Sequence, residues 1–246
     1  MSLNLPNVTL VCVEDTNEDD VKLAGEIVSG IKKQINFYDI KLLSSFNLSS
    51  VTDRIEPINS LEEYSIFVLN ELIKYTESEF VMIMQKDGYP LLPSSWSEEF
   101  LKYDYIGAPW TRALTSKGVS IPVPPFSQYH KLYAEGSVGN GGFSLRSRKL
   151  MEEVASRKYN CTPIHNYLWN DKGWIFSEDE YICRYLRSDL ESKGFKFAPV
   201  EIAQCFSVEN DAWVGQFGFH GNRTLEINKA MGRLKFDSHL YEERSI

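Results

Sequence analysis

The residues of this 246-residue chain that are best suited to chemistry lie in four short segments. They are Asp87 in Gln85-Lys-Asp-Gly88, the loop Gly139-Asn-Gly-Gly142, the pair Glu178-Asp179, and His220 between two glycines. Carboxylates and imidazoles accept protons and bind divalent cations, and glycines let the backbone approach a ligand closely. Each segment is expected at the end of a strand or helix, which is where substrate sites form.

Each segment alone also has an ordinary structural interpretation. Asp before Gly is common in turns, and the acidic run from Glu178 to Glu180 suits the first turn of any helix. A single histidine such as His220 is more often a turn residue than a ligand. Only the combination of segments favours a functional site.

Hydrophobic patterns predict the elements that position these segments. Residues 80–84 are all apolar and too few for a helix, which indicates a central strand buried on both faces. A strand at 7–13, a helix at 19–35 and a strand at 39–43 predict a βαβ unit and a parallel sheet. Ligands of such sheets bind beyond the carboxyl ends of the strands, where residues 85–87 stand.

The remaining elements follow from caps and periodicity. Ser60 with Glu63, and Ser177 with Glu180, are capping boxes that begin two helices, the first with an apolar face that includes Tyr64. The second helix is expected to end near residues 193–194. Further predicted elements are strands at 54–58, 104–107, 142–145 and 195–206, helices at 97–102, 148–157 and 223–234, and a glycine-flanked turn at 217–221. The aperiodic segments 108–136 and 160–175 are predicted as loops, the first of them a lid over a bound ligand.

The composition is that of an ordinary globular protein. A hydrophobic content of 43% and a charged content of 24% support a packed core, and the length fits one domain, residues 1–246. A net charge of -8 without clustered Lys and Arg argues against a nucleic-acid partner and favours a small-molecule substrate. The four cysteines lack C-x-x-C spacing, and no stretch has the length of a membrane span. We therefore expect a cytoplasmic protein without a transmembrane segment.

Together these segments resemble a glycosyltransferase of the GT-A type, and in particular a family of poorly characterised glycosyltransferase-like proteins. The motifs that carry the resemblance are Q-x-D-G at 85–88, YDYIGAPW at 103–110, GNGGFSLRS at 139–147, an E-D pair at 178–179 and FGFHG at 217–221. The resemblance implies one GT-A-like (Rossmann-like) α/β domain with a mixed, mainly parallel sheet flanked by helices.

The resemblance also implies a metal site. GT-A enzymes hold a divalent metal on the donor diphosphate with a D-x-D motif, and this chain has Gln85, Lys86 and Asp87 there, so the first aspartate is missing. The implied metal ligands are Asp87 and His220, and an imidazole among oxygens favours Mn²⁺ over Mg²⁺ or Ca²⁺. Lys86 is a further source of positive charge for the diphosphate.

The acceptor side of the reaction is implied to use the E-D pair. Asp179 would be the catalytic base and Glu178 would position the acceptor. The residues expected to bind the donor are Thr9, Asp15, Gln85, Lys86, Asp87, Asn140, Gly141 and Gly142.

Two main interpretations stay open. The first is an inverting, metal-assisted glycosyltransferase that uses a nucleotide-sugar donor and a carbohydrate or small hydroxyl acceptor. The second is a non-catalytic nucleotide-sugar or carbohydrate binding module of the same fold, which Gln85 in place of an aspartate favours. A nucleotidyltransferase ranks last because no glycine- and Lys/Arg-rich loop follows the first strand to hold a triphosphate.

Overall fold

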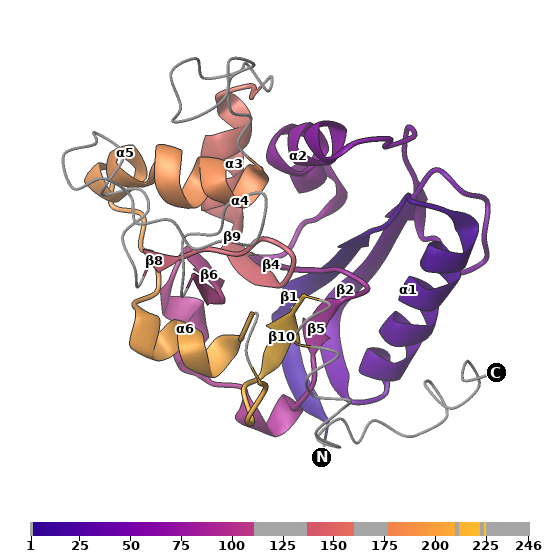
Figure 1. Ribbon diagram of the computed structural model, residues 1–246, viewed down its shortest axis with the longest axis horizontal. Helices are drawn as coiled ribbons and strands as arrows, with labels where there is room; N and C mark the ends of the chain where they lie inside the picture. Colours follow the sequence, from indigo (N-terminus) through magenta and orange to yellow (C-terminus); the bar gives the residue numbers. More distant parts are fainter. Residues whose placement is uncertain (1, 111–136, 160–176, 210–211, 222–223, 225–246) are drawn as a thin grey trace.

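A six-stranded sheet in the order β3-β2-β1-β4-β9-β6 forms the centre of the protein (Figure 1). The computed structural model describes residues 2–110, 137–159, 177–209, 212–221 and 224. β3, β2, β1 and β4 are parallel, and β9 runs antiparallel between β4 and β6. The mixed, mainly parallel α/β fold is therefore confirmed, and the order 3-2-1-4 is the Rossmann-like one. The sheet strands are β1 (Leu3–Val13), β2 (Ile35–Ser44), β3 (Asp53–Arg54), β4 (Phe80–Met84), β6 (Tyr105–Gly107) and β9 (Ser144–Ser147).

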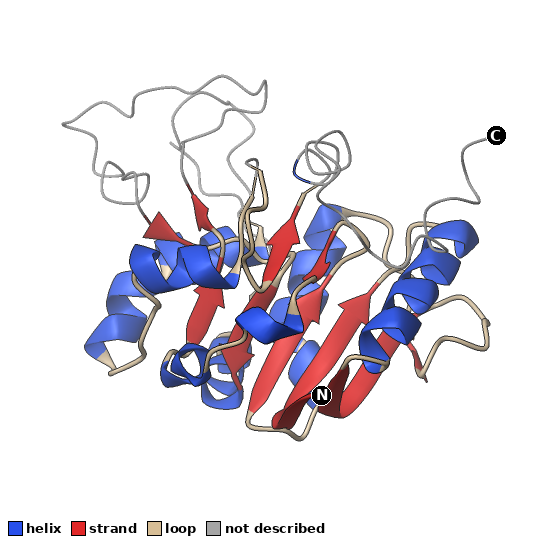
Figure 2. Cartoon of the chain, turned by 90° about the horizontal axis from the view of Figure 1, so that it is seen from below, coloured by secondary structure: helices blue, strands red, loops and turns tan. Residues whose placement is uncertain are grey.

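Helices cover both faces of the sheet (Figure 2). They are α1 (Glu18–Lys32), α2 (Leu61–Asn70), α3 (Arg148–Ser156), α4 (Glu178–Glu180), α5 (Arg187–Ser192) and α6 (Val200–Phe206), with short turns η1 (Leu72–Tyr75), η2 (Pro93–Ser95) and η3 (Glu98–Lys102). The predicted Ser60 cap is present, since its side chain accepts a hydrogen bond from the backbone N–H of Glu63. Asn17 caps α1 in the same way.

The strand β4 is buried on both faces, as its unbroken apolar sequence predicts. Met82 and Met84 belong to the hydrophobic cluster that contains the buried face of α1. Val81 and Ile83 belong to the cluster on the opposite side, with residues of α2 and α3. Alternate side chains of a strand point to opposite faces, so a strand between two helical layers needs apolar residues at every position.

The structure corrects two predicted elements near the carboxyl end, besides the turn at 217–221 described below. The predicted strand at 195–206 is mostly the helix α6, which begins after Pro199 and buries Ala203 and Phe206 one helical turn apart. The predicted helix after Ser177 is broken into α4, a π-helical turn η5 (Tyr181–Tyr185) and α5. Ser177 does not cap it, because its hydroxyl donates to Oδ1 of Asp179 at 2.5 Å instead.

Two small antiparallel pairs complete the fold. β5 (Gly88–Pro90) pairs with β10 (Gly218–His220), and β7 (Pro109–Trp110) pairs with β8 (Ser137–Val138). The predicted turn at 217–221 is therefore largely a strand. The predicted lid beyond residue 110, the loop at 160–175 and the helix at 223–234, apart from residue 224, lie outside the described residues.

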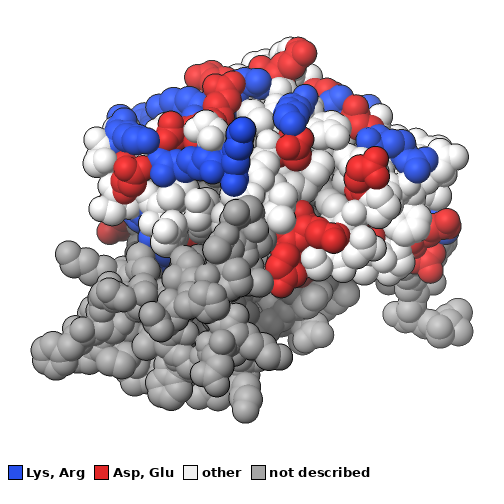
Figure 3. All heavy atoms as spheres, turned by 90° about the horizontal axis from the view of Figure 1, so that it is seen from above, with Lys and Arg blue, Asp and Glu red and all other residues white. Residues whose placement is uncertain are grey.

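Charged side chains of both signs are mixed on the face shown in Figure 3. Among the described helices, none combines the length and the apolar character that crossing a membrane requires.

Candidate functional site

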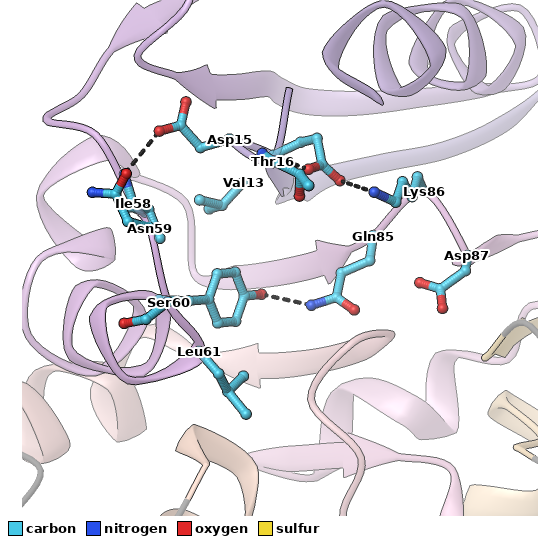
Figure 4. A pocket seen from close by; sticks show the side chains of 12 residues that line it. Val13, Asp15, Thr16, Ile58, Asn59, Ser60, Leu61, Gln85, Lys86 and Asp87 are labelled. Atoms are coloured by element: carbon cyan, nitrogen blue, oxygen red, sulfur yellow. Dashed lines mark hydrogen bonds and ion pairs between the residues drawn. The ribbon is translucent and has the colours of Figure 1, made fainter. Parts of the chain in front are cut away.

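A cavity of about 520 Å³ opens at the carboxyl ends of β1 and β4 (Figure 4). This is where the chain order of the parallel strands reverses, since β2 lies on one side of β1 and β4 on the other. Ligands of open α/β sheets bind at such a point. The cavity is lined by Val13, Glu14, Asp15, Thr16, Ile58, Asn59, Ser60, Leu61, Tyr64, Gln85, Lys86 and Asp87.

Asp15 lines this cavity, as a predicted donor contact should, but its carboxylate is already engaged by the protein. Oδ1 accepts hydrogen bonds from the Ser44 hydroxyl at 2.9 Å and the Ser45 N–H at 2.6 Å, and Oδ2 accepts one from the Ile58 N–H at 2.8 Å. These bonds join the end of β2 to the segment that leads into α2. Asp15 therefore shapes the wall of the cavity.

Two other predicted donor contacts are differently placed. Thr9 is 1% exposed within β1, and its hydroxyl lies 2.6 Å from that of Ser78, so the structure does not bring it into the cavity. Lys86 reaches the cavity but pairs with Asp20 at 2.6 Å and Glu14 at 3.5 Å. Burial alone would lower the pKa of Lys86, but the hydrogen bond to Asp20 and the charge of Glu14 raise it. The ammonium is thus charged and already partly neutralised.

The structure brings Asp87 and His220 together from positions far apart in the chain. β5 and β10 pair with Gly88 opposite His220, and the N–H of Gly221 donates to the carbonyl of Asp87 at 2.8 Å. Nε2 of His220 lies 3.8 Å from Oδ1 of Asp87 and 3.1 Å from Oε1 of Gln85. Asp87 and His220 therefore lie close together, as predicted, and Gln85 joins them; the metal or diphosphate that they would share stays a prediction.

Two glycines make room for the His220 ring. A Cβ atom on Gly88 would lie 2.5 Å from Cδ2 of His220, and one on Gly142 would lie 2.0 Å from Nε2. Carbon atoms normally keep about 3.5 Å or more from their neighbours, so neither position tolerates a side chain without a shift of the ring. The glycines of Q-x-D-G and GNGG are therefore needed here for close packing on the histidine.

Acidic side chains surround the imidazole. Burial alone would lower the pKa of His220, but Glu209, Asp87 and Asp179 outweigh it and raise the pKa. Nδ1 of His220 lies 3.4 Å from Oε1 of Glu209. Nothing in the sequence pattern indicated Glu209, because the contact depends on how residues 208–209 lie beside β10.

The glycine loop also holds Asp179. Oδ2 of Asp179 accepts a hydrogen bond from the N–H of Gly141 at 2.9 Å, while Oδ1 accepts from Ser177 and from the N–H of Glu180 at 2.8 Å. Because Gly141 binds Asp179 and the next residue, Gly142, packs on His220, two consecutive glycines connect both parts of the site.

Asn140 precedes these glycines in a left-handed conformation, with φ of 61°. Asparagine tolerates this conformation better than most residues. Its side chain is 2% exposed, and Oδ1 has no hydrogen-bond partner among the described residues. A buried acceptor without a donor lowers the free energy of unfolding by about 1–3 kcal/mol.

Glu178, the predicted acceptor-positioning residue, lies in the core with 4% exposure. Its Oε1 pairs with the guanidinium of Arg146 at 2.8 Å, and a Cβ on Gly141 would lie 1.8 Å from the same oxygen. Burial, aided by the charge of Asp179, raises the pKa of Glu178 although Arg146 opposes the shift. The ion pair of Arg146 and Glu178 therefore packs directly against Gly141 of the glycine loop.

Sequence reasoning assigned Tyr64 only to packing, yet Tyr64 lines the cavity. The amide nitrogen of Gln85 donates to this hydroxyl at 3.1 Å, which turns Oε1 of Gln85 toward His220. A buried tyrosine usually finds a polar partner, and that rule is the one signal that could have marked it.

Comparison with known proteins gives little functional information. A family model described as "Protein of unknown function (DUF5672)" matches residues 46–220. No curated protein matches the chain. A197 from STIV, known from a crystal structure, is similar with a TM-score of 0.33 and 15% identity, over 71% of this chain and 75% of that chain. A likeness this weak identifies neither fold nor function.

Proposed function

The chain belongs to this family of unknown function (DUF5672), and we propose that it is a GT-A-type glycosyltransferase. It would transfer a sugar from a nucleoside-diphosphate sugar to a carbohydrate or small hydroxyl acceptor, with inversion at the anomeric carbon. The observation that carries the proposal is the convergence of Gln85, Asp87 and His220 beside the cavity, next to the loop that holds Asp179. A cytoplasmic location belongs to the same proposal, and the free thiols of Cys12, Cys183 and Cys205 are compatible with it.

The three converging side chains fit a divalent metal such as Mn²⁺. Ligands bound at about 2.1 Å in an octahedral site lie about 3 Å apart, and Nε2 of His220 is 3.1 Å from Oε1 of Gln85 and 3.8 Å from Oδ1 of Asp87. No group of three or more His, Cys, Asp or Glu side chains suited to a metal occurs in the described part of the chain. Among the described side chains, the amide oxygen of Gln85, 3.1 Å from Nε2 of His220, would be the third ligand.

The negative charge of the cavity lining is the reason why a diphosphate would need a metal ion there. Glu14, Asp15 and Asp87 line the cavity, and Lys86 is shared between Glu14 and Asp20, so the wall alone would repel a diphosphate. A bound divalent cation would supply the positive charge that the leaving diphosphate needs. Gln85 in place of an aspartate lowers the negative charge of the site by one, which favours weak metal binding completed by the donor phosphates.

Asp179 is the proposed base because its carboxylate is held in place and retains accepting capacity. A carboxylate has about four acceptor sites, and three protein donors occupy Asp179. About one site remains for the hydroxyl of an acceptor. The side chain is partly exposed, so a substrate can reach it.

The binding module remains a second candidate because of Gln85 and Lys86. Gln85 removes one metal-binding charge, and Lys86 is paired with two carboxylates rather than free for phosphate. Such a protein would bind a nucleotide sugar in the same cavity without transferring the sugar.

The test is a panel of nucleoside-diphosphate sugars with and without Mn²⁺, followed by thermal unfolding. A ligand at 100 times its Kd stabilises the native state by about 2.7 kcal/mol. For a chain of this size, that raises Tm by roughly 5–11 °C. Ligands that bind are then assayed for release of the nucleoside diphosphate in the presence of simple sugars.

Two variants make the result specific to the site. Asp87→Asn should abolish the Mn²⁺-dependent shift, while Glu201→Gln on the exposed side of α6 should leave it unchanged. Binding without any diphosphate release would favour the binding module. If no nucleotide sugar changes Tm with or without Mn²⁺, both functions fail.

A further inference from the structure

Glu209 contacts the nitrogen of His220 that faces away from the proposed metal ligands. Nε2 of His220 lies near Gln85 and Asp87, while Nδ1 lies 3.4 Å from Oε1 of Glu209. The side chains of His220 and Glu209 are 17% and 22% exposed, so water competes only partly for this contact.

The backbone fixes the ring between its neighbours. On one side, His220 pairs with Gly88 of β5. On the other side, its N–H donates to the carbonyl of Val208 at 2.9 Å, and Glu209 forms a parallel bridge with it. The acidic groups on the two sides of the ring therefore come from segments that are both bonded to the strand carrying the histidine.

Packing of the ring leaves its orientation undecided. Gly88 and Gly142 confine the ring, but a half-turn exchanges Nδ1 with Cδ2 and Nε2 with Cε1 at almost the same volume. A neutral imidazole also has one N–H donor and one acceptor nitrogen, and the neighbours decide which is which. In the metal-free protein both ring nitrogens face acceptors, since Nε2 lies 3.1 Å from Oε1 of Gln85 and Nδ1 faces the carboxylate of Glu209. A cation bound at Nε2 would take the place of the proton there, and the carboxylate of Glu209 then faces the N–H that remains on Nδ1.

We propose that Glu209 is a positioning residue that accepts the N–H of Nδ1 of His220 when the lone pair of Nε2 binds a divalent cation together with Gln85 and Asp87. This inference rests on the metal site of the proposed function. Metal-bound histidines commonly donate their second N–H to a carboxylate, which fixes the ring and strengthens the ligand. Nδ1 has no other hydrogen-bond partner among the described residues, so a shortening of the 3.4 Å contact by a few tenths of an ångström completes the bond.

The first measurement is Mn²⁺ affinity of the full chain without substrate, by the electron paramagnetic resonance signal of free Mn²⁺. Glu209→Ala should weaken binding about 10- to 100-fold, the usual effect of removing a carboxylate behind a ligand histidine. Glu209→Gln should lose less, because its amide oxygen still accepts the Nδ1 proton. Glu201→Ala, an exposed glutamate of α6, is the matched control and should bind as the wild type does.

The second measurement is NMR of the His220 ring with Zn²⁺ bound as a diamagnetic cation in place of Mn²⁺. The wild type should show a hydrogen-bonded Nδ1–H resonance, and in Glu209→Ala this proton should exchange rapidly with water. A merely structural role of Glu209 would lower Tm without changing this resonance, so Tm is recorded for every variant.

The outcomes separate the two proposals. Equal Mn²⁺ affinities of the wild type and Glu209→Ala, or an Nδ1–H resonance that is the same in both, overturn the role of Glu209 and leave the proposed function standing. A wild type that binds no Mn²⁺, with or without a nucleotide sugar, overturns the metal site and the role of Glu209 with it.

Discussion

Replacing Gly142 by alanine should disturb the proposed metal site through one methyl group. The added Cβ would lie 2.0 Å from Nε2 of His220, 2.4 Å from Cδ2 and 2.6 Å from Cε1. Contacts to carbon are normally about 3.5 Å or longer, so the ring or the loop must move by about 1.5 Å. Gly142 itself has an ordinary negative φ, so the effect is one of space rather than backbone conformation.

The size of the effect follows from the overlap. Overpacking of a well-packed site costs about 1–3 kcal/mol. For a domain of this size we expect Tm to fall by roughly 2–12 °C. A shift of Nε2 by more than 1 Å removes it from the ligand geometry with Asp87, and misplacement on this scale costs about 100-fold in rate.

The assay is thermal unfolding together with Mn²⁺ titration, in a double-mutant cycle with His220→Ala. The smaller side chain removes the overlap, so adding Gly142→Ala to His220→Ala should destabilise far less than adding it to the wild type. Mn²⁺ binding should be lost in both His220→Ala backgrounds.

Additive stability losses would refute the reasoning, because they would mean that the methyl group and the ring do not meet. A Gly142→Ala variant with wild-type Mn²⁺ affinity would show that His220 is not a ligand.

Asp179→Asn should lower turnover about 10²- to 10⁴-fold with little change in donor binding, while Glu180→Gln in the same turn should cost little. Arg146→Met should lower the free energy of unfolding by about 3–5 kcal/mol, since it leaves Glu178, at 5% side-chain exposure, without its partner. In denaturant unfolding, the double change Arg146→Met with Glu178→Gln should recover part of this loss. The raised pKa of His220 predicts that stability falls as pH rises from about 6.5 through the folded-state pKa, because the native ring holds its proton longer than the unfolded one.

Each of these expectations has a clear contrary result. Equal losses of turnover in Asp179→Asn and Glu180→Gln would mean that the acidic residues only stabilise the first turn of the helix. Full stability of Arg146→Met would mean that Glu178 takes up a proton or finds water. For the pH effect, urea unfolding of the wild type and His220→Gln is compared from pH 6 to pH 9, and the slope must disappear in the variant; a slope common to both would belong to other groups.

The sequence predicted β4 well because burial on both faces leaves an unbroken apolar pattern. The helix α6 was missed because its seven residues contain too little periodicity to separate a helix from a strand. The start of α6 after Pro199 and the burial of Ala203 and Phe206 identify it as a helix, but only the folded structure shows that these two residues are buried.

The site was predictable where several polar segments occur together at the ends of predicted elements, and unpredictable where a contact in the folded chain decides the role of a residue. Asp87 and His220 lie close together because β5, which begins directly after Asp87, pairs with β10, with Gly88 opposite His220. Asp15 was a reasonable donor contact from its position after β1, but only the structure reveals three hydrogen bonds that occupy it. No sequence pattern marks Glu209, because its role depends on a contact with His220 that forms only in the folded chain.

The segment Phe217 to Gly221 shows how packing places a functional side chain. Phe217 and Phe219 are both fully buried, and the ring of Phe219 meets that of Tyr89 edge-on at 4.9 Å. A Cβ on Gly218 would lie 2.3 Å from the ring of Phe143, so a glycine is needed between the two phenylalanines.

The same segment ends at Gly221 with φ of +95°, a conformation that favours glycine, and its N–H binds the carbonyl of Asp87. Three residues of pairing between β5 and β10 would be too few to hold a strand in register in water. The aromatic contacts provide that stability, and His220 is then the one side chain of the strand left to face Gln85 and Asp87. The aromatic residues of this motif thus serve the site at a distance: enlarging or deleting one of them would move the histidine without touching a ligand.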